Sequence, residues 1–302
     1  MTKMRLAWVP VVVLLLSFGA LGACGGGSDE DPSLNGVSYG NQTFVAVGAD
    51  GRILSSPDGR SWTARQAPEA QPSLAAVRFI GGRFLAVGAS GVTVSSLDGE
   101  SWEAGSVGAD TDLLGLGAGA PGIVIVGAAG AAFWSASGLD WQAVEVDTTE
   151  NLFDVVWGEG RFVAVDDGGG IFESIDGRTW VAAESPVEVP LFTITYARGI
   201  FLAGGQAGNL VRHTSDGGWQ TVSLFSAQPV IAIAWGRGIF VIVGGSGTVY
   251  TTPDTELISA AGVRSTASLQ GVVAGDDSFV TVGQNGAIFS SLDGVAWRNF
   301  TP

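Results

Sequence analysis

The residues of this sequence with the clearest capacity for chemistry are aspartates that recur at a regular interval. Five of them lie in a Ser/Thr-x-Asp-Gly segment, and these are Asp58, Asp98, Asp176, Asp216 and Asp293. A carboxylate can bind a metal ion or act as a general acid. An active site, however, does not recur along a chain, so a role in folding is favoured. We therefore expect no catalytic residue, no metal site and no cofactor here.

The interval between these segments indicates internal repeats. Equivalent positions are 58, 98, 137, 176, 216, 254 and 293, and they differ by 40, 39, 39, 40, 38 and 39 residues. Three copies are degenerate: Ser137 replaces the aspartate, the unit at Asp216 is one residue short, and Asp254 has lost the following glycine and tryptophan. A fixed period of this length is typical of repeat architectures. We expect the unit around Asp254 to be the least stable.

Each unit has the pattern of four short strands. In the first unit the apolar runs are 37–39, 44–48, 52–56 and 62–65, separated by segments rich in Gly, Asn and Asp. Those residues supply the positive φ of tight hairpin turns. Four strands in about 40 residues are typical of a propeller blade. The sequence therefore predicts an all-β fold, a seven-bladed β-propeller of four-stranded antiparallel blades over residues 34–302, with no strand exchanged between the first and last blades.

A tryptophan follows most of the turns, at Trp62, Trp102, Trp141, Trp180, Trp219 and Trp297. We expect each aspartate to accept backbone N–H bonds within its turn, the glycine to be left-handed and the tryptophan to bury its ring. A second aromatic series, at Tyr39, Phe79, Trp157, Tyr196 and Trp235, is interrupted by Ala118 and Ala274. We expect this series to form core between blades and not a stacking platform for ligands.

The Ser/Thr-x-Asp-x-Gly-x-x-Trp pattern, here with Asp followed directly by Gly, resembles the Asp-box (BNR) repeat of sialidases and related propellers. Over about residues 34–301 the chain is similar to bacterial Asp-box propellers of the photosystem II assembly-factor-like group, which implies a non-catalytic protein. Sialidases use a Tyr nucleophile and an Arg clamp, but the chain has only Tyr39, Tyr196 and Tyr250. Its single histidine, His213, gives no basis for a Ser-His-Asp centre.

The N-terminal segment resembles a bacterial lipoprotein signal. Lys3 and Arg5 precede an apolar run, which ends in Leu21-Gly22-Ala23-Cys24, and Cys24 is the only cysteine. We expect residues 1–23 to be a cleaved signal peptide, Cys24 to be lipidated, and 24–33 to be a flexible acidic tether. This predicts a lipid-anchored monomer of the cell envelope, in the outer membrane or at the cell surface.

The charge balance limits the partners. The formal net charge is −15, with 14 basic and 29 acidic residues. This argues against nucleic acid or anionic lipid as a partner, and it is compatible with solubility, with cation binding or with a basic protein partner. We expect a binding module for a protein or glycan partner in the envelope. An alternative is a carbohydrate-active hydrolase or lyase with two carboxylates at the channel mouth.

Binding is expected on the face formed by the loops between second and third strands and between blades. The candidate binding residues in the first set of loops are Asp50, Asp166, Asp167, Gln206, Gln284 and Asn285. The between-blade loops are expected to add Glu69, Asp110, Asp112, Asp147, Glu150, Glu188 and Glu256. Asp166-Asp167 is the leading candidate, because Asp166 replaces a glycine that stands there in the other six units.

Overall fold

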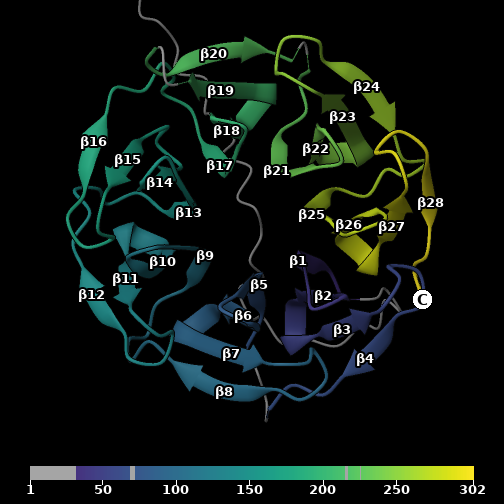
Figure 1. Cartoon of the computed structure of the whole chain (residues 1–302), viewed down its shortest axis with the longest axis horizontal. Helices are drawn as coiled ribbons and strands as arrows, with labels where there is room; N and C mark the ends of the chain where they lie inside the picture. The colour runs from purple at the N-terminus through teal and green to yellow at the C-terminus, as the bar shows by residue number, and fades with distance from the viewer. Residues whose placement is uncertain (1–31, 69–71, 215–216, 225) are drawn as a thin grey trace, which may run out of the picture. The chain divides into compact units, whose positions relative to one another are not determined.

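The computed structural model describes residues 32–68, 72–214, 217–224 and 226–302. This part of the chain forms seven four-stranded antiparallel sheets arranged in a ring around a central channel (Figure 1). The prediction of a seven-bladed β-propeller is therefore confirmed. The predicted signal peptide, Cys24, residues 24–31 of the tether, Glu69 and Asp216 lie outside the described residues. No helix among the described residues has the length and apolar character of a membrane span.

Each blade consists of four consecutive strands, ordered from the channel outward. The innermost strands are β1 (Leu34–Gly40), β5 (Leu74–Ile80), β9 (Leu113–Gly119), β13 (Leu152–Gly158), β17 (Leu191–Ala197), β21 (Val230–Gly236) and β25 (Leu269–Ala274). The second strands are β2 (Thr43–Gly48), β6 (Arg83–Gly88), β10 (Gly122–Gly127), β14 (Arg161–Asp166), β18 (Ile200–Gly205), β22 (Ile239–Gly244) and β26 (Phe279–Gly283).

The outer half of each blade completes the sheet. The third strands are β3 (Ile53–Ser56), β7 (Val92–Ser96), β11 (Ala132–Ser135), β15 (Ile171–Ser174), β19 (Asn209–Thr214), β23 (Thr248–Thr252) and β27 (Ile288–Ser291). The fourth strands are β4 (Thr63–Arg65), β8 (Glu103–Ser106), β12 (Gln142–Val144), β16 (Val181–Ala183), β20 (Gln220–Ser223), β24 (Ser259–Gly262) and β28 (Trp297–Asn299). Blades are numbered 1 to 7 in chain order.

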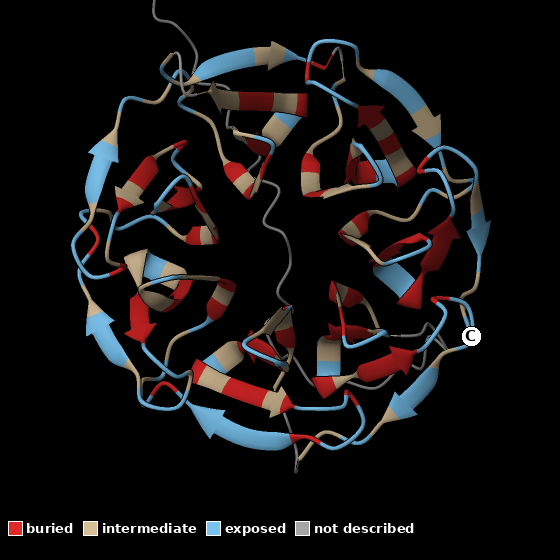
Figure 2. Ribbon diagram, viewed as in Figure 1, coloured by how far each residue is buried: buried red, intermediate tan, exposed pale blue. Residues whose placement is uncertain are grey.

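Burial follows the order of the strands. The second strands are almost wholly buried because a neighbouring blade covers each of their faces, which explains their continuous apolar runs. The fourth strands form the exposed rim of the ring (Figure 2). The core is thus a set of apolar layers between blades, and each layer mixes residues of two neighbouring blades.

The aromatic series on the innermost strands packs between blades, as predicted. A Cβ on Gly40 would overlap the Phe79 ring of the next blade, and a Cβ on Gly119 would overlap Trp157. Each ring also stacks on a phenylalanine of its own second strand; for Trp157 and Phe162 the ring centroids are 4.7 Å apart. Small residues at the end of one innermost strand therefore make room for the ring of the next.

Among the described residues, the ring is closed by side-chain contacts between blades 1 and 7. Blades 1 and 7 keep their own four strands, which confirms the predicted absence of strand exchange. Their contact layer is apolar and includes Val37 and Phe44 from blade 1 with Val280 and Ile288 from blade 7. The Tyr39 hydroxyl donates a hydrogen bond to Asp276 Oδ2 at 2.8 Å across the same boundary.

The turns between second and third strands depart from one expectation. They are short 3₁₀ turns, Ala49–Gly51, Ala89–Gly91, Ala128–Gly130, Gln206–Gly208, Gly245–Gly247 and Gln284–Gly286. The central residue has positive φ in all of them, but it is alanine at Ala129 (φ 52°) and Ala207 (φ 53°). It is serine at Ser90 (φ 55°) and Ser246 (φ 53°). The expectation that Gly, Asn or Asp would supply this conformation is therefore wrong at four of the six turns, where the strand ladders on both sides impose it.

The turn between third and fourth strands, here called the outer turn, is organised by its aspartate. Asp98 Oδ1 accepts hydrogen bonds from the backbone N–H groups of Glu100 (2.8 Å) and Ser101 (2.9 Å). Asp58, Asp176, Asp254 and Asp293 make the same pair of bonds. In the degenerate sixth copy, Thr255 (φ 70°) takes the left-handed position of the glycine, so this turn keeps its geometry.

The tryptophans after the outer turns pack against the layers between blades. Trp102 is buried, and the other five are partly buried. Trp180 and Trp297 donate Nε1–H to Gly177 O and Gly294 O of their own turns. These rings therefore link each outer turn to the core beneath it.

The outer turns predict a loss of stability in acid. Backbone N–H bonds, from Ser101 and then Glu100 for Asp98, lower the pKa of the carboxyl below its usual 3.8, and the same cause lowers the pKa of Asp176 and Asp293. Near and below pH 4 the unfolded chain then binds more protons than the folded chain. The stability that these carboxylates contribute is therefore fully present above their unfolded pKa and is lost as the pH falls through their folded pKa. Urea unfolding of the wild type at pH 7 and pH 3 should show this loss. A triple Asp98→Asn, Asp176→Asn, Asp293→Asn variant should lose less between the two pH values; an equal loss would contradict this prediction.

Candidate functional site

The innermost strands of all seven blades line the central channel, which holds a cavity of about 600 Å³. Most side chains that face it are small or apolar. The third residue of each innermost strand is small in six blades and is Asp154 in blade 4. The fifth residue is small or uncharged in six blades and is Arg78 in blade 2. Arg78 and Asp154 are thus the two charged side chains in the described lining of the channel.

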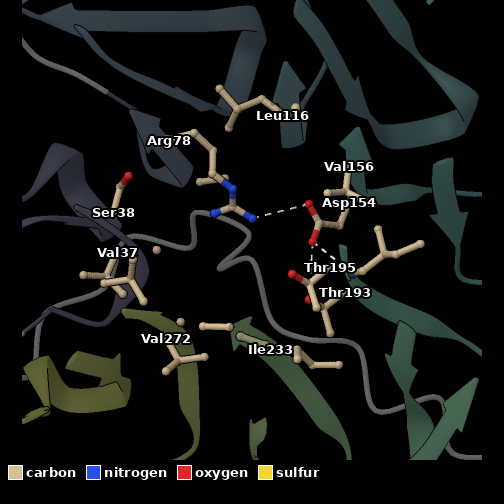
Figure 3. A pocket seen from close by; sticks show the side chains of 18 of the residues that line it. Val37, Ser38, Arg78, Leu116, Asp154, Val156, Thr193, Thr195, Ile233 and Val272 are labelled. Carbon is tan, nitrogen blue, oxygen red and sulfur yellow. Dashed lines mark hydrogen bonds and ion pairs between the residues drawn. The ribbon is translucent and has the colours of Figure 1, made fainter. Parts of the chain in front are cut away.

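Arg78 and Asp154 meet across the channel (Figure 3). Arg78 Nη2 lies 3.6 Å from Asp154 Oδ1, although the two residues come from strands β5 and β13 of blades that are not neighbours. The Arg78 side chain is 44% exposed, whereas the Asp154 side chain is 9% exposed. The guanidinium therefore retains contact with the open channel while the carboxylate is enclosed.

Asp154 is held by the protein backbone. Its Oδ1 accepts a bond from Val155 N at 2.9 Å, and its Oδ2 accepts bonds from Ile194 N at 3.1 Å and the Thr193 hydroxyl at 3.3 Å. Burial raises the pKa of Asp154, while Arg78 and the backbone bonds act in the opposite direction. This carboxylate ties β13 to β17 and to the far wall of the channel.

A β-bulge at the start of every innermost strand shapes the mouth of the channel on the loop face. The second residue of each strand has no ladder partner, as between Leu152 and Asp154 in β13. The bulge turns these side chains into the channel. They form a ring, here called the bulge ring, of Asn35, Ala75, Leu114, Phe153, Phe192, Ile231 and Gln270.

The bulge ring is chemically asymmetric. Blades 3 to 6 contribute Leu114, Phe153, Phe192 and Ile231, all half-buried, and these four are called the apolar arc. The Phe153 and Phe192 rings meet edge to face with centroids 5.4 Å apart. Blades 7 and 1 contribute the amides Gln270 and Asn35. Partly exposed apolar side chains gathered at a channel mouth are typical of a binding surface.

The candidate residues on the loop face differ in accessibility. Asp50, Gln284 and Asn285 are exposed at the tips of their turns, and Gln206 and Asp167 are half-buried. Asp110, Asp112, Asp147, Glu150 and Glu188 are exposed in the between-blade loops. Several bond to a neighbouring loop, as Asp112 Oδ1 does to Ser90 N at 3.1 Å. The loop face therefore carries an exposed acidic surface around the apolar arc.

Asp166 does not belong to that exposed surface. It is only 2% exposed. Its Oδ1 accepts bonds from Gly168 N (3.0 Å) and Gly170 N (2.6 Å), and its Oδ2 accepts one from the Thr148 hydroxyl (3.0 Å). The carboxylate thus organises its own turn, which explains why an aspartate can stand where other blades have glycine. The sequence-based expectation that Asp166 is an accessible binding residue is therefore wrong.

Two further acidic residues behave differently from what their sequence positions indicate. Glu256 was expected in a between-blade loop, but its N–H bonds Asp254 in an outer turn, so it lies on the opposite face. Glu150 lies beside Asp167, and their hydrogen bond and mutual repulsion raise the pKa of Glu150. Asp167 in turn accepts bonds from Asn151 N and Nδ2, which orders this part of the loop face.

The side chains that line the channel limit the reactions that it can support. Among the described residues that line the channel, Asp154 is the only carboxylate, so the pair of facing carboxylates needed for glycoside hydrolysis does not occur there. Within the same described residues, no three His, Cys, Asp or Glu side chains converge as metal ligands would. The channel offers a ligand both hydrogen-bonding side chains and apolar surface, and one guanidinium, a hydrogen-bond donor, faces its interior.

The fold places the chain among seven-bladed β-propellers, and comparisons of structure agree. The chain is similar to streptogramin B lyase, with a TM-score of 0.78 and 11% identity over 89% of this chain and 94% of that one. It is also similar to YCF48 from Cyanidioschyzon merolae (TM-score 0.68, 16% identity, 87% and 96% covered). A structure of YCF48 bound to D1 peptide matches with a TM-score of 0.70 and 16% identity, covering 87% and 92%. No protein-family model and no curated protein sequence matches.

At these identities the likeness establishes the fold alone. Sequence reasoning missed three features of the site: Arg78, Asp154 and the bulge ring. A signal was available for the first two, because each is the only charged residue at its level among the innermost strands. The bulge ring had a weaker signal, since apolar residues at the second position also suit a buried strand.

Proposed function

We propose that this protein is a non-catalytic binding module of the cell envelope, tethered as a monomer through lipid on Cys24. Its partner is a protein segment that rests on the loop face and the apolar arc. The observation that carries this proposal is the position of Phe153 and Phe192 at the channel mouth, directly after the acidic loops that hold Glu150 and Glu188. Apolar side chains flanked by lysine or arginine would complement this surface.

The comparisons support the proposal in a general sense. Propellers of similar structure include YCF48 bound to a peptide, and a WD40 propeller domain (TM-score 0.72, 13% identity). The outer turns, which we assign to the Asp-box type on their sequence and hydrogen bonds, then serve folding and not recognition. A glycan partner would rely on hydrogen bonds to the acidic loops and depends less on the apolar arc.

Charge reversal on the loop face tests the proposal. Asp147→Lys, Glu150→Lys and Glu188→Lys together should reduce partner capture from envelope extracts at least about tenfold while leaving the melting temperature within about 2 °C, since exposed loop charges contribute little to stability. Mass spectrometry of the captured material identifies the partner. A matched variant, Glu103→Lys with Asp140→Lys and Asp277→Lys, reverses three exposed charges outside the loop face and should capture the same partner fully.

Two further measurements separate the alternatives. Raising the ionic strength from about 0.1 M to about 1 M shortens the screening length from ~10 to ~3 Å and should weaken capture of a basic partner. Phe153→Ser with Phe192→Ser should abolish capture of a protein and spare that of a glycan. Equal capture by the loop-face variant and its matched control would refute the proposal.

A further inference from the structure

A second cavity, of about 580 Å³, opens between blades 2 and 3 on the face opposite the loop face. Blade 2 contributes Ile80, Arg83 and Leu85, and blade 3 contributes Ala118, Ile123 and Ser137. The volume lies in the range of small-molecule sites. This cavity shares no wall with the apolar arc, although Ile80 and Ala118 also line the inner end of the channel.

The cavity exists because blade 3 lacks two aromatic rings that other blades possess. In blade 4, Trp157 packs on Phe162, and in blade 2, Phe79 packs on Phe84 with ring centroids 4.8 Å apart. Blade 3 has Ala118 and Ile123 at these positions. Ile80 fills part of the space, since it replaces the small residue that ends most of the other innermost strands. The remainder is open.

The outer turn of blade 3 also stands away from blade 2. A Cβ on Gly177 of blade 4 would touch Trp134 and Val124 of the blade before it. A Cβ on Gly138, the equivalent glycine of blade 3, would meet only Ile123 of its own blade, at 3.1 Å. The gap between blades 2 and 3 therefore extends from the innermost strands to the outer turn.

One cation lines this gap without a carboxylate partner. Arg161 occupies the equivalent place in blade 4, where it forms ion pairs with Glu159 (3.3 Å) and Glu173 (3.2 Å) and lies over the Phe201 ring. In blade 2 the positions equivalent to the two glutamates are Gly81 and Ser95, so Arg83 lacks both carboxylates. The next blade has Ile123 where blade 5 has the phenylalanine ring. Within the described residues Arg83 has no ion pair.

Ser137 removes the remaining obstacle to an anion. Its equivalents in the outer turns of the other blades are aspartates, whose charge would repel a bound carboxylate. The hydroxyl of Ser137 accepts only a 3.3 Å bond from Leu139 N, and its proton remains able to donate.

We propose that this cavity binds a small aromatic carboxylic acid. The ring of the ligand takes the space that the aromatic pair fills in other blades, against Ile80, Leu85 and Ile123. Its carboxylate pairs with Arg83, whose guanidinium matches a carboxylate in a bidentate manner and also favours a neighbouring ring. Because this site and the loop face lie on opposite sides of the ring, it would be occupied independently of the partner of the loop face.

The experiment titrates the full-length protein with 2-naphthoate, followed by calorimetry, with 2-naphthalenemethanol as the uncharged comparison. The wild type should bind naphthoate at one saturable site with a Kd on the order of 1 mM or tighter. Arg83→Gln should weaken binding about tenfold or more, because it removes a charge-assisted bond. Ser137→Asp, which restores the residue type of the other turns, should weaken it similarly. Arg60→Gln, an exposed arginine on the same face, should leave it unchanged.

A third variant tests the place of the ring. Ala118→Trp restores the residue of blade 4 and should abolish naphthoate binding without lowering the melting temperature. The proposal is overturned if the wild type shows no saturable binding, if Arg83→Gln and Ser137→Asp both bind as the wild type does, or if the alcohol binds as tightly as the acid. Arg83→Gln and Ser137→Asp are surface changes compatible with the fold. They therefore decide the outcome even if Ala118→Trp fails to fold.

Discussion

Replacing Gly88 with alanine is expected to destabilise the ring by about 2–3 kcal/mol, a large effect for one methyl group. A Cβ at this position would overlap the carbonyl oxygen of Ser73 and lie 2.9 Å from Leu74 Cα, both of them backbone atoms that no rotamer change can move. The cost arises from close approach and not from φ, because the Gly88 backbone is extended (φ −167°). Urea unfolding should show a lower midpoint with an unchanged slope.

Gly262→Ala is the matched control. Gly262 also lies in a strand, but a Cβ there meets nothing within 4 Å. This substitution should raise stability slightly, by about 0.5 kcal/mol, because alanine restricts the unfolded chain more than glycine does. Equal stability of Gly88→Ala and Gly262→Ala would contradict the close contact between the end of strand β6 and the start of β5.

Removing the buried carboxylate of the channel is the second large effect. Asp154→Ala should cost about 3 kcal/mol, because it leaves the Ile194 N–H, the Val155 N–H and the Thr193 hydroxyl without their acceptor. Arg78→Met should cost less, about 1 kcal/mol, since its partly exposed guanidinium is screened by water. The measurement is the free energy of unfolding of each variant in urea at pH 7.

A double-mutant cycle separates the ion pair from the backbone bonds. The Asp154→Ala, Arg78→Met variant should be more stable than the sum of the two single losses predicts, because no unpaired charge remains in the channel. Strict additivity would show that the 3.6 Å contact contributes nothing to stability. A loss below about 1 kcal/mol for Asp154→Ala would contradict the role of the carboxylate in joining β13 to β17.

The sequence predicted the ring because its period and its turns are local signals. In the first blade the expected second, third and fourth strands lie within one residue of the observed β2, β3 and β4, whereas β1 begins three residues before the expected start. The alternation on the innermost strands indicates which side chains face the core. What it did not show is how side chains from different blades meet. Arg78 and Asp154 are 76 positions apart, and only the curvature of the closed ring brings them together. Asp166 was misjudged for a related reason, since its burial depends on the course of its own turn.

The same limit applies to the second cavity. Ala118 was visible as a gap in the aromatic series, but its consequence depends on Ile80, Arg83 and Ser137, which belong to other strands and another blade. A substitution that looks like simple degeneration of a repeat can therefore open a space with specific chemistry. Comparison of the blades with one another, once they are superposed by the fold, makes that space recognisable.

The ladders of this ring join only residues close in the sequence, since each sheet is built from four consecutive strands. The boundary between blades 1 and 7 is different, because its hydrogen bond from Tyr39 to Asp276 spans 237 positions and none of the described strands is shared across it. Each blade can thus form soon after its synthesis, and closure of the circle is the slow, last event. Transient opening at this seam would separate apolar surfaces without breaking a single ladder, so the earliest amide exchange in the innermost strands should appear in β1 and β25.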